Sequence, residues 1–401
     1  MADHLPSEVI TDILCRVPAN SLLRFRSISK WWRSLIDSTH FIFLHLHKTT
    51  YSFLILRQHS HLYRIDLDSP NQAVEIDHPL MCYSNRIKIL GSCNGLLCIC
   101  NIADDIALWN PTLRKHRILP SEPLNRNKTP EENINNNTTF CAAHVHGFGY
   151  DSFSGDYKLV SISYFVDLQR GTFDSKVKLF SLRMDSWKSL PSLPYALCCA
   201  RTMGVFVGGA LHWVVTRKLE PDQPDLVVAF DLRLESFKEV ELPETVKGNF
   251  DMNVALLGGC LSVTENRGVT EMGMGGFDVW VLKVYGSRDS WCKLLTVAQL
   301  CEVKNLRPLA YSRNGDGDKV LMEQDRSKLC WYDLKNGDVS CARISGLPSL
   351  IEGIVCVGSL VPPKLLSPTS DDSRSELHRL GHGSTRKRRD DFLSKGFKLT
   401  L

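Results

Sequence analysis

A strand-and-turn pattern that recurs along most of the chain constrains its fold more than any other feature. In each copy an alternating apolar and polar stretch closes on a polar residue, and turn-forming residues follow. The six copies are Ile65-Asp66-Leu67, Trp109-Asn110-Pro111, Phe180-Ser181-Leu182, Phe230-Asp231-Leu232, Leu282-Lys283-Val284 and Tyr332-Asp333-Leu334. Their middle residues lie 44, 71, 50, 52 and 50 positions apart. Short alternating stretches bounded by Gly, Asn, Asp and Pro are typical of β-strands, so this region is expected to be all-β.

The spacing of these copies predicts a propeller. A polar insert, Ser121 to Asn137, accounts for the one long interval. A second motif interleaves with the first, since Gly208-Gly209 and Gly258-Gly259 are 50 positions apart. A period of about 50 residues with paired glycines is that of kelch-type propeller blades, which predicts about six blades and leaves five and seven open. Residues 351–361 are expected to supply the closing strand, beside residues 51–56.

The first 47 residues follow a helical period instead. The apolar positions of the first predicted helix, at the spacing of one helix face, are Val9, Ile10, Ile13, Leu14 and Val17. Pro6 suits the first turn of this helix, and Pro18 ends it. Ser29 is placed to cap a third helix, and a last turn or two follows. A module of about 45 residues is marginal alone, so we expect a partner or the following domain to stabilise it.

The net charge of +4 is concentrated at the C-terminal end. Residues 362–401 contain nine Lys and Arg against five Asp and Glu, and the remainder carries 39 of each sign. A neutral body has no overall field to attract phosphates, so nucleic acid is not an expected partner. The tail is expected to be disordered. Its dense basic run, Arg386-Lys387-Arg388-Arg389, predicts a nuclear-import signal and hence both nuclear and cytoplasmic locations.

Neither a secretory signal nor a membrane span is expected. The sequence does not open on a basic run followed by an apolar core, and no stretch approaches the ~18 consecutive apolar residues of a membrane helix. We therefore expect a soluble intracellular protein whose fourteen cysteines are reduced thiols. None of them forms a Cys-x-x-Cys pair, which argues against a zinc site.

Residues that could carry catalysis are better explained by the fold. Gly91-Ser92-Cys93-Asn94-Gly95 has the spacing of a nucleophile elbow, but a strand and not a helix follows it, so a hairpin turn is expected. His144 and His146 could share one strand face, yet no third metal ligand follows at a recognisable spacing. Asn314 to Asp318 resembles the start of a calcium loop and lacks its later ligands. No catalytic set, cofactor site or metal site is predicted.

The helical module resembles the F-box of plant F-box proteins almost position by position. The matching stretches are Leu5-Pro6-x-Glu8-Val9, Ile13-Leu14-x-Arg16-Val17-Pro18, Ser21-Leu22-Leu23-Arg24-Phe25-Arg26-Ser27-Ile28-Ser29-Lys30-x-Trp32 and Leu35-Ile36. The strand region is similar to the F-box-associated, kelch-like domain of the same family. The motifs that carry this second similarity are Asn94-Gly95-Leu96, Trp109-Asn110-Pro111-x-x-Arg114, Gly147-Phe148-Gly149-Tyr150-Asp151 and Asp289-Ser290-Trp291.

The resemblance implies a small all-α F-box over residues 1–47, an all-β kelch-like propeller over 51–361 and a basic tail over 362–401. It implies a non-catalytic substrate-recognition subunit of an SCF-type ubiquitin ligase, which promotes ubiquitination and proteasomal degradation of a target protein. The F-box would bind a Skp-family (plant ASK) adaptor and through it cullin and a RING protein. The expected adaptor-binding residues are Leu5, Pro6, Val9, Ile10, Ile13, Leu14, Val17 and Pro18.

The C-terminal stretch 387–399 resembles that of a family member that represses plant defence. This similarity implies an intracellular NLR-type immune receptor as the target and hence negative regulation of defence. Two other interpretations stay open. One is an F-box receptor in another pathway, such as pollen self-incompatibility. The other is a propeller enzyme, such as an oxidase or glycosidase, although no catalytic cluster of residues supports it.

Overall fold

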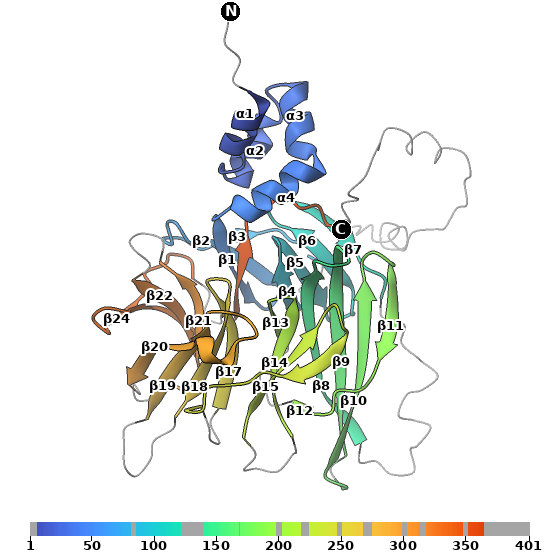
Figure 1. Cartoon of the computed structure of the whole chain (residues 1–401), viewed down its shortest axis with the longest axis vertical. Helices are drawn as coiled ribbons and strands as arrows, with labels where there is room; N and C mark the ends of the chain where they lie inside the picture. The colour runs from blue at the N-terminus through green and yellow to red at the C-terminus, as the bar shows by residue number, and fades with distance from the viewer. Residues whose placement is uncertain are drawn as a thin grey trace, which may run out of the picture. The chain divides into compact units, whose positions relative to one another are not determined.

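The computed structural model describes residues 6–81, 86–121, 139–167, 169–197, 203–217, 224–246, 251–267, 275–298, 303–312, 318–347 and 352–364. Within these residues, four α-helices occupy the first 48 positions, and the rest is strands joined by turns and one 3-10 helix (Figure 1). The predicted order of a helical module followed by an all-β region is confirmed. The predicted features at residues 314–317 and 386–389 lie outside the described residues.

The helical module consists of α1 (Ser7–Leu14), α2 (Ala19–Phe25), α3 (Lys30–Asp37) and α4 (Thr39–Lys48). Pro6 and Pro18 stand at the N-caps of α1 and α2, so Pro18 begins a helix as well as following one. Ser29 caps α3 as predicted, because its hydroxyl accepts the Trp32 N–H at 3.1 Å. Helices this short are marginal alone, so their stability comes from packing against one another. The fully or nearly buried apolar residues of the module are Leu14, Cys15, Ala19, Leu22, Ile36, Phe41 and Ile42.

Four of the sheets have four strands each, and each is antiparallel throughout. In sheet order they are β25 (Glu352–Val357), β1 (Ser52–Gln58), β2 (His61–Asp66) and β3 (Val74–Ile76); β4 (Ile87–Cys93), β5 (Leu96–Asn101), β6 (Ile106–Asn110) and β7 (Lys115–Ile118); β17 (Asp251–Leu257), β18 (Cys260–Asn266), β19 (Gly276–Leu282) and β20 (Trp291–Ala298); and β21 (Leu306–Tyr311), β22 (Lys319–Gln324), β23 (Lys328–Asp333) and β24 (Val339–Cys341). The 3-10 helix Arg288–Ser290 precedes β20. Such four-stranded meanders are propeller blades.

A fifth sheet has nine strands. Its order is β11 (Ser186–Leu190), β10 (Thr172–Ser181), β9 (Asp156–Asp167), β8 (Thr139–Asp151), β13 (Met203–Val207), β14 (Ala210–Thr216), β15 (Leu226–Asp231) and β16 (Ser236–Glu239), with β12 (Ala196–Leu197) beside β14. Two antiparallel four-stranded units are joined here by a short parallel pairing of β8 with β13. About six blades were predicted; four stand as separate sheets, and this sheet merges two further four-stranded units.

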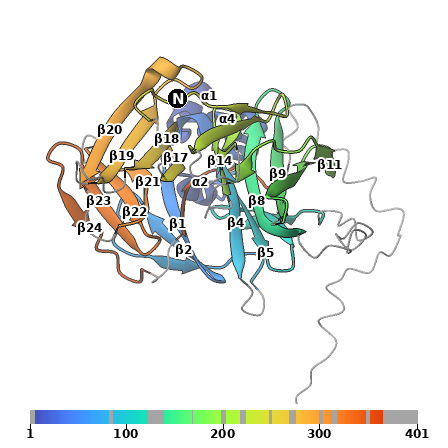
Figure 2. The same ribbon diagram turned by 90° about the horizontal axis from the view of Figure 1, so that it is seen from below.

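Two glycines explain why these units merge. Gly147 of β8 pairs with Gly204 of β13. A Cβ atom at Gly147 or Gly204 would lie 2.8 or 2.5 Å from the indole ring of Trp213. Because neither residue has a side chain, the two strands approach each other over this buried ring. Figure 2 shows the sheets arranged around a common centre.

The predicted closing strand is confirmed. β25 pairs antiparallel with β1, with Phe53 opposite Cys356 and Leu54 opposite Val355. The first and last strands of the β-region therefore share one sheet, which closes the ring by main-chain hydrogen bonds between segments about 300 residues apart.

Asn110 fixes the chain just after β25. Its side-chain amide, fully buried, donates to the carbonyls of Ser359 at 3.1 Å and Val361 at 2.8 Å. Its Oδ1 accepts the N–H groups of Thr112 at 2.8 Å and Leu113 at 3.1 Å. The Trp109-Asn110-Pro111 motif thus ends β6 in a turn and also anchors the closing segment.

Most tryptophans of the β-region are buried or half-buried. Trp213, Trp280 and Trp291 are 3%, 9% and 8% exposed, whereas Trp187 and Trp331 are half-buried. The Nε1–H group of Trp291 donates to the Glu241 carbonyl at 2.9 Å, so this side chain ties β20 to the preceding blade.

A buried histidine also links two blades. His212 of β14 lies between the Val205 carbonyl and the Tyr285 hydroxyl, each 2.9 Å from a ring nitrogen. Burial, reinforced by the charge of Lys238, lowers the pKa of His212 to about 4. The imidazole is therefore neutral in the folded protein near neutral pH.

Candidate functional site

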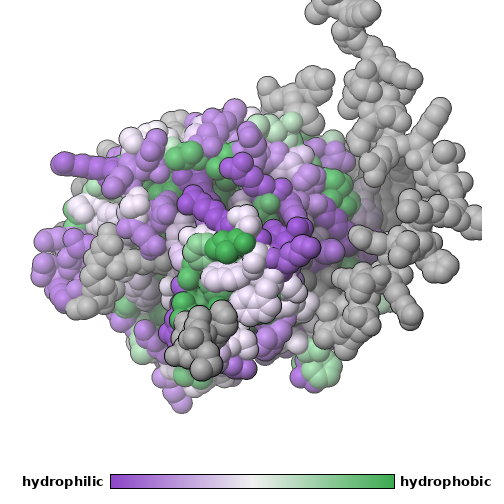
Figure 3. All heavy atoms as spheres, turned by 90° about the horizontal axis from the view of Figure 1, so that it is seen from above, coloured by the Kyte–Doolittle hydropathy of each residue, from purple (hydrophilic) through white to green (hydrophobic). Residues whose placement is uncertain are grey.

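The α1 helix exposes apolar side chains that the rest of the module does not cover. Val9 is 42% exposed and Ile13 is 51% exposed, and they lie one helical turn apart on one side of α1. Pro6, at the N-cap, is also exposed. Exposed apolar groups at i and i+4 suit docking against a partner's hydrophobic surface. Figure 3 shows hydrophobic side chains at the surface among hydrophilic ones on the face seen from above.

The other predicted adaptor-binding residues divide by burial. Leu14 is 3% exposed and belongs to the interior of the module, so a direct adaptor contact predicted for it does not fit this structure. Ile10 and Val17 are half-buried, and Pro18 is exposed. Leu5 lies outside the described residues. Helical period alone placed Ile13 and Leu14 on the same face, and only the packing of the other helices separates them.

Two exposed apolar residues near the start of α3 enlarge the uncovered surface of the module. Ile28 is 60% exposed and Trp31 is 47% exposed. The ring of Trp31 packs edge-on against Trp32, which in turn packs edge-on against the half-buried Phe25, so ring contacts hold the exposed indole. The sequence showed the doubled tryptophan but not which of the two rings faces solvent.

An ion-pair cluster fixes α1 against the last helix of the module. Asp12 bonds Lys48 and pairs with Arg16 at 3.2 Å. The hydrogen bond from Lys48 lowers the pKa of Asp12, and the Arg16 charge contributes. His45 of α4 also reaches the Val17 carbonyl at 3.0 Å. These contacts set the orientation of the exposed side of α1.

A second uncovered apolar cluster lies on the β-region. Phe153, Met184 and Leu234 are 73%, 71% and 71% exposed, and each stands in the turn of a hairpin. The three turns are neighbours. Arg233 lies 3.9 Å above the Phe153 ring, and Arg183 donates to the Ser154 carbonyl at 2.7 Å. We name these three apolar residues the turn patch.

A buried lysine holds the turns of this patch together. Lys158, 7% exposed, bonds Asp151 at 3.1 Å, Glu235 at 3.2 Å and the Leu232 carbonyl at 2.6 Å. Lys188 bonds Glu235 from the outermost strand of the same blade. Burial raises the pKa of Glu235, but hydrogen bonds from Lys188 and Lys158 outweigh it and lower the pKa. The charged form of Glu235 is therefore favoured. The patch is thus presented on preorganised turns and not on flexible loops.

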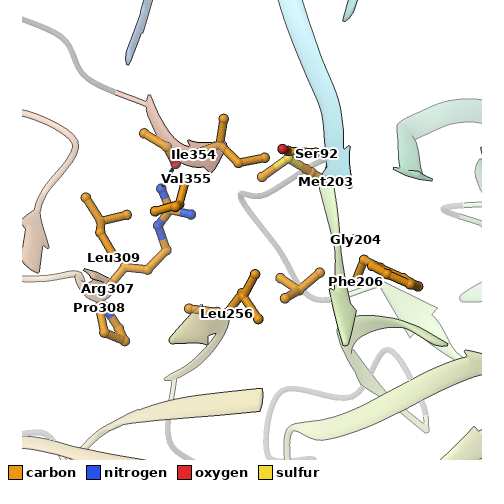
Figure 4. A pocket seen from close by; sticks show the side chains of 13 residues that line it. Ser92, Met203, Gly204, Phe206, Leu256, Arg307, Pro308, Leu309, Ile354 and Val355 are labelled. Atoms are coloured by element: carbon orange, nitrogen blue, oxygen red, sulfur yellow. Dashed lines mark hydrogen bonds between the residues drawn. The ribbon is translucent and has the colours of Figure 1, made fainter. Parts of the chain in front are cut away.

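The centre of the β-region offers little room for a ligand. A cavity of about 50 Å³ is lined by innermost strands, among them β4, β13, β17, β21 and β25. Figure 4 shows Leu256, Met203 and Ile354 pointing toward this space. Arg307 turns to the cavity wall, where it pairs with Glu323 at 2.6 Å and also bonds the Gly353 carbonyl. A space of this size holds a few water molecules.

The motifs considered as catalytic candidates lie on strands and in a hairpin turn within the described residues. Gly91 to Gly95 forms the β4–β5 hairpin, as predicted, and burial raises the pKa of the Cys93 thiol well above its usual range. His144 and His146 do share a strand face, with stacked rings 4.4 Å apart. Among the residues that the structure describes, no group of three or more His, Cys, Asp or Glu could hold a metal ion. No described helix is long and apolar enough to cross a bilayer.

Comparison with known proteins assigns both domains. Residues 3–44 match the F-box domain, and residues 52–358 match the F-box associated beta propeller domain. The chain is 35% identical to F-box protein CPR1 of Arabidopsis thaliana, with 99% of each chain covered. It is 32% identical to F-box protein At4g22390 of the same plant, again over 99% of both chains. The F-box/kelch-repeat protein At3g23880 is 31% identical over 83% of this chain and 89% of its own length. This chain therefore belongs to the F-box proteins that carry an F-box-associated β-propeller.

Proposed function

We propose that this protein is the substrate-recognition subunit of an SCF-type ubiquitin ligase and has no catalytic activity of its own. Membership of the F-box family supports the role, because an F-box domain implies binding to a Skp-type adaptor within an SCF complex. The observation that carries the proposal is the uncovered apolar side of α1, formed by Pro6, Val9 and Ile13. An exposed apolar surface on a small helical module, whose helices are held by ion pairs and hydrogen bonds, suits docking and not a reaction site.

The target is proposed to bind on the β-region. The turn patch combines large exposed apolar side chains with the guanidinium groups of Arg183 and Arg233. Rigidly held aromatic, Met and Arg side chains are typical anchors of protein interfaces. The small central cavity, in contrast, suits no protein segment. These features favour capture of a protein on the turns over catalysis in the centre.

We further propose that the target is an intracellular plant immune receptor, so that the protein restrains defence in the cytoplasm and the nucleus. Support comes from the similarity of the C-terminal stretch to that of a defence-repressing family member. We expect the level of such a receptor to rise when the protein is removed. Proteasome inhibition should then raise the receptor level no further. A receptor level that does not respond would contradict the target class and leave the ligase role standing.

The docking role of α1 is tested with two matched double variants. Val9→Ala with Ile13→Ala removes exposed apolar groups from α1, whereas Val74→Ala with Ile118→Ala removes the same groups from the β-region. Their exposures are similar, 42% and 51% against 50% and 49%. Truncating two interface anchors typically costs at least about 2 kcal/mol, so adaptor affinity should fall by about 30-fold or more.

Co-purification and titration calorimetry with a purified Skp-family adaptor measure the difference. We expect the α1 variant to lose adaptor binding while its melting temperature stays close to that of the unchanged protein. The β-region variant should bind normally. Equal adaptor affinity of the two variants would refute the proposed docking surface.

The turn patch is tested by its effect on target turnover. Replacing Phe153, Met184 and Leu234 together by Ser should slow turnover of the target and leave adaptor binding unchanged. Ile102→Ser is the matched control, because Ile102 is 66% exposed in a different turn. Turnover that remains normal in the triple variant would place the target elsewhere on the β-region.

A further inference from the structure

Two cysteines face each other across the outer strands of one blade. Cys330 lies on β23 and Cys341 on β24, and they are directly paired in the antiparallel register. Their sulfur atoms are 3.9 Å apart. Cys330 is buried, whereas Cys341 is exposed on the outermost strand of the sheet. The pair belongs neither to the α1 surface nor to the turn patch.

The hydrogen-bond pattern of the two strands sets the spacing of this pair. The Ala342 N–H donates to the Leu329 carbonyl at 2.8 Å, and the Asp333 N–H donates to the Asp338 carbonyl at 2.9 Å. Hydrogen-bonded and non-hydrogen-bonded pairs alternate along an antiparallel ladder, so Cys330 and Cys341 form a non-hydrogen-bonded pair. Such pairs have Cα atoms about 4.5 Å apart, within the range that a disulfide spans. A rotation of the exposed Cys341 side chain is enough to bring the sulfurs to bonding distance.

We propose that Cys330 and Cys341 are a peroxide-responsive dithiol that forms an intramolecular disulfide and fastens β24 to β23. Hydrogen peroxide first oxidises the exposed Cys341 thiolate to a sulfenic acid, which releases hydroxide. The Cys330 sulfur then attacks the sulfenic sulfur. The S–S bond forms as the S–OH bond breaks, and the departing hydroxyl takes the Cys330 proton and leaves as water. The two thiols lose two electrons in total, and the peroxide gains them.

The surroundings of Cys330 suit the role of the thiol that attacks the sulfenic acid in the second step. Burial and the neighbouring Cys341 raise the pKa of Cys330 to about 11, and only Lys328 opposes this shift. Gln324 accepts a hydrogen bond from the Cys330 thiol at 3.6 Å, and the Tyr332 phenol interacts electrostatically with both Cys330 and Cys341. Cys330 is therefore protonated near neutral pH, and buried, so access favours Cys341 as the site of first attack.

The position of the pair gives the disulfide a structural consequence. Just beyond Cys341, Ser345 receives the Ala73 N–H at 2.8 Å and donates its own N–H to the Asn71 carbonyl at 2.9 Å. These bonds connect the last complete blade to the sheet that closes the ring. The crosslink would close a short loop and restrict the opening of the edge strand that leads into this seam.

The test uses the full-length protein treated with hydrogen peroxide, then alkylated under denaturing conditions. Trypsin cleaves after Lys328, Lys335 and Arg343, so a disulfide would link the peptides 329–335 and 336–343 in a mass spectrum. We expect this linked pair in the unchanged protein and in Cys292→Ser, which removes another exposed cysteine from an outermost strand. Cys341→Ser should abolish it and leave Cys330 reduced.

Hydrogen exchange supplies the second readout. Oxidation should slow exchange in residues 336–343 by about tenfold or more in the unchanged protein and not in Cys341→Ser. The proposal is overturned if Cys292 reacts with peroxide while Cys330 and Cys341 stay alkylatable. It is also overturned if either partner crosslinks to a different cysteine, or if the linked peptides form without slower exchange.

Discussion

Replacing Asn110 by Ala should loosen the ring at its closing strand. The substitution deletes the hydrogen bonds that Asn110 donates to the carbonyls of Ser359 and Val361 and those that it accepts from the N–H groups of Thr112 and Leu113. At about 1 kcal/mol for each bond, and more where a buried group stays unpaired, the free energy of unfolding should fall by about 4 kcal/mol. With a urea slope of about 3 kcal/mol per M, the unfolding midpoint should fall by a little more than 1 M.

Asn101→Ala is the matched control for this substitution. Asn101 is 5% exposed in the same sheet, but its side chain bonds only Asp105, at 2.9 and 3.0 Å, within one tight turn. We expect a loss of about 2 kcal/mol and no change at the closing strand. Hydrogen exchange in β25 distinguishes the two variants, because only Asn110→Ala should expose residues 352–357. Equal midpoint shifts, or full protection of β25 in Asn110→Ala, would refute the anchoring role.

Three further outcomes are expected. Trp213→Ala should cost about 3–5 kcal/mol in a thermal or urea melt, because the ring fills the space beneath two paired glycines; a loss below 1 kcal/mol would contradict that packing. The free energy of unfolding should decline as pH falls from about 6.5 toward 4, because His212 takes up a proton in the unfolded chain but stays neutral in the folded protein. His212→Gln should remove about 2–4 kcal/mol of this decline, as measured by urea unfolding at a series of pH values. Replacing all four residues of the basic run, 386–389, by Ala should reduce the nuclear fraction of the protein seen by fluorescence microscopy. An unchanged nuclear fraction would show that this run is not an import signal.

The repeat predicted the β-region because strands and turns depend on residues that are close together in the sequence. Alternation sets strands, and the Asn94-Gly95 turn has the positive φ angles, 53° and 79°, that a tight hairpin needs. The closing strand was also predicted, as residues 351–361 beside residues 51–56, and β25 pairs with β1. The anchoring role of Asn110 was not predictable in this way. Its partners lie about 250 residues away, and only the closed ring brings them together.

Surface exposure was the second feature that local pattern did not determine. The turn residues Met184 and Leu234 occupy the same place after a strand end, and that repeated apolar position was a usable signal. Phe153 belongs to a different hairpin of the blade, and its contact with Arg233 depends on how two blades meet. In the helical module, Ile13 and Leu14 satisfy the same period, and neighbouring helices decide that Leu14 is interior.

The pairing of β1 with β25 also dictates the order of events during synthesis. β1 leaves the ribosome early, but its partner follows only after about 300 more residues, roughly 15–60 s later at 5–20 residues per second. Through that interval β1 can pair with β2 along one edge, but its other edge has no partner strand along the apolar residues Phe53 to Leu56, while the helical module before it is already complete. A chain that stops before residue 352 would keep this strand edge unpaired permanently, and an unpaired apolar edge favours aggregation. Under the proposed function, such a fragment would still bind the adaptor and would not deliver a target, so premature stop codons shortly before residue 352 should act as dominant inhibitors, whereas stops after residue 357 keep β25.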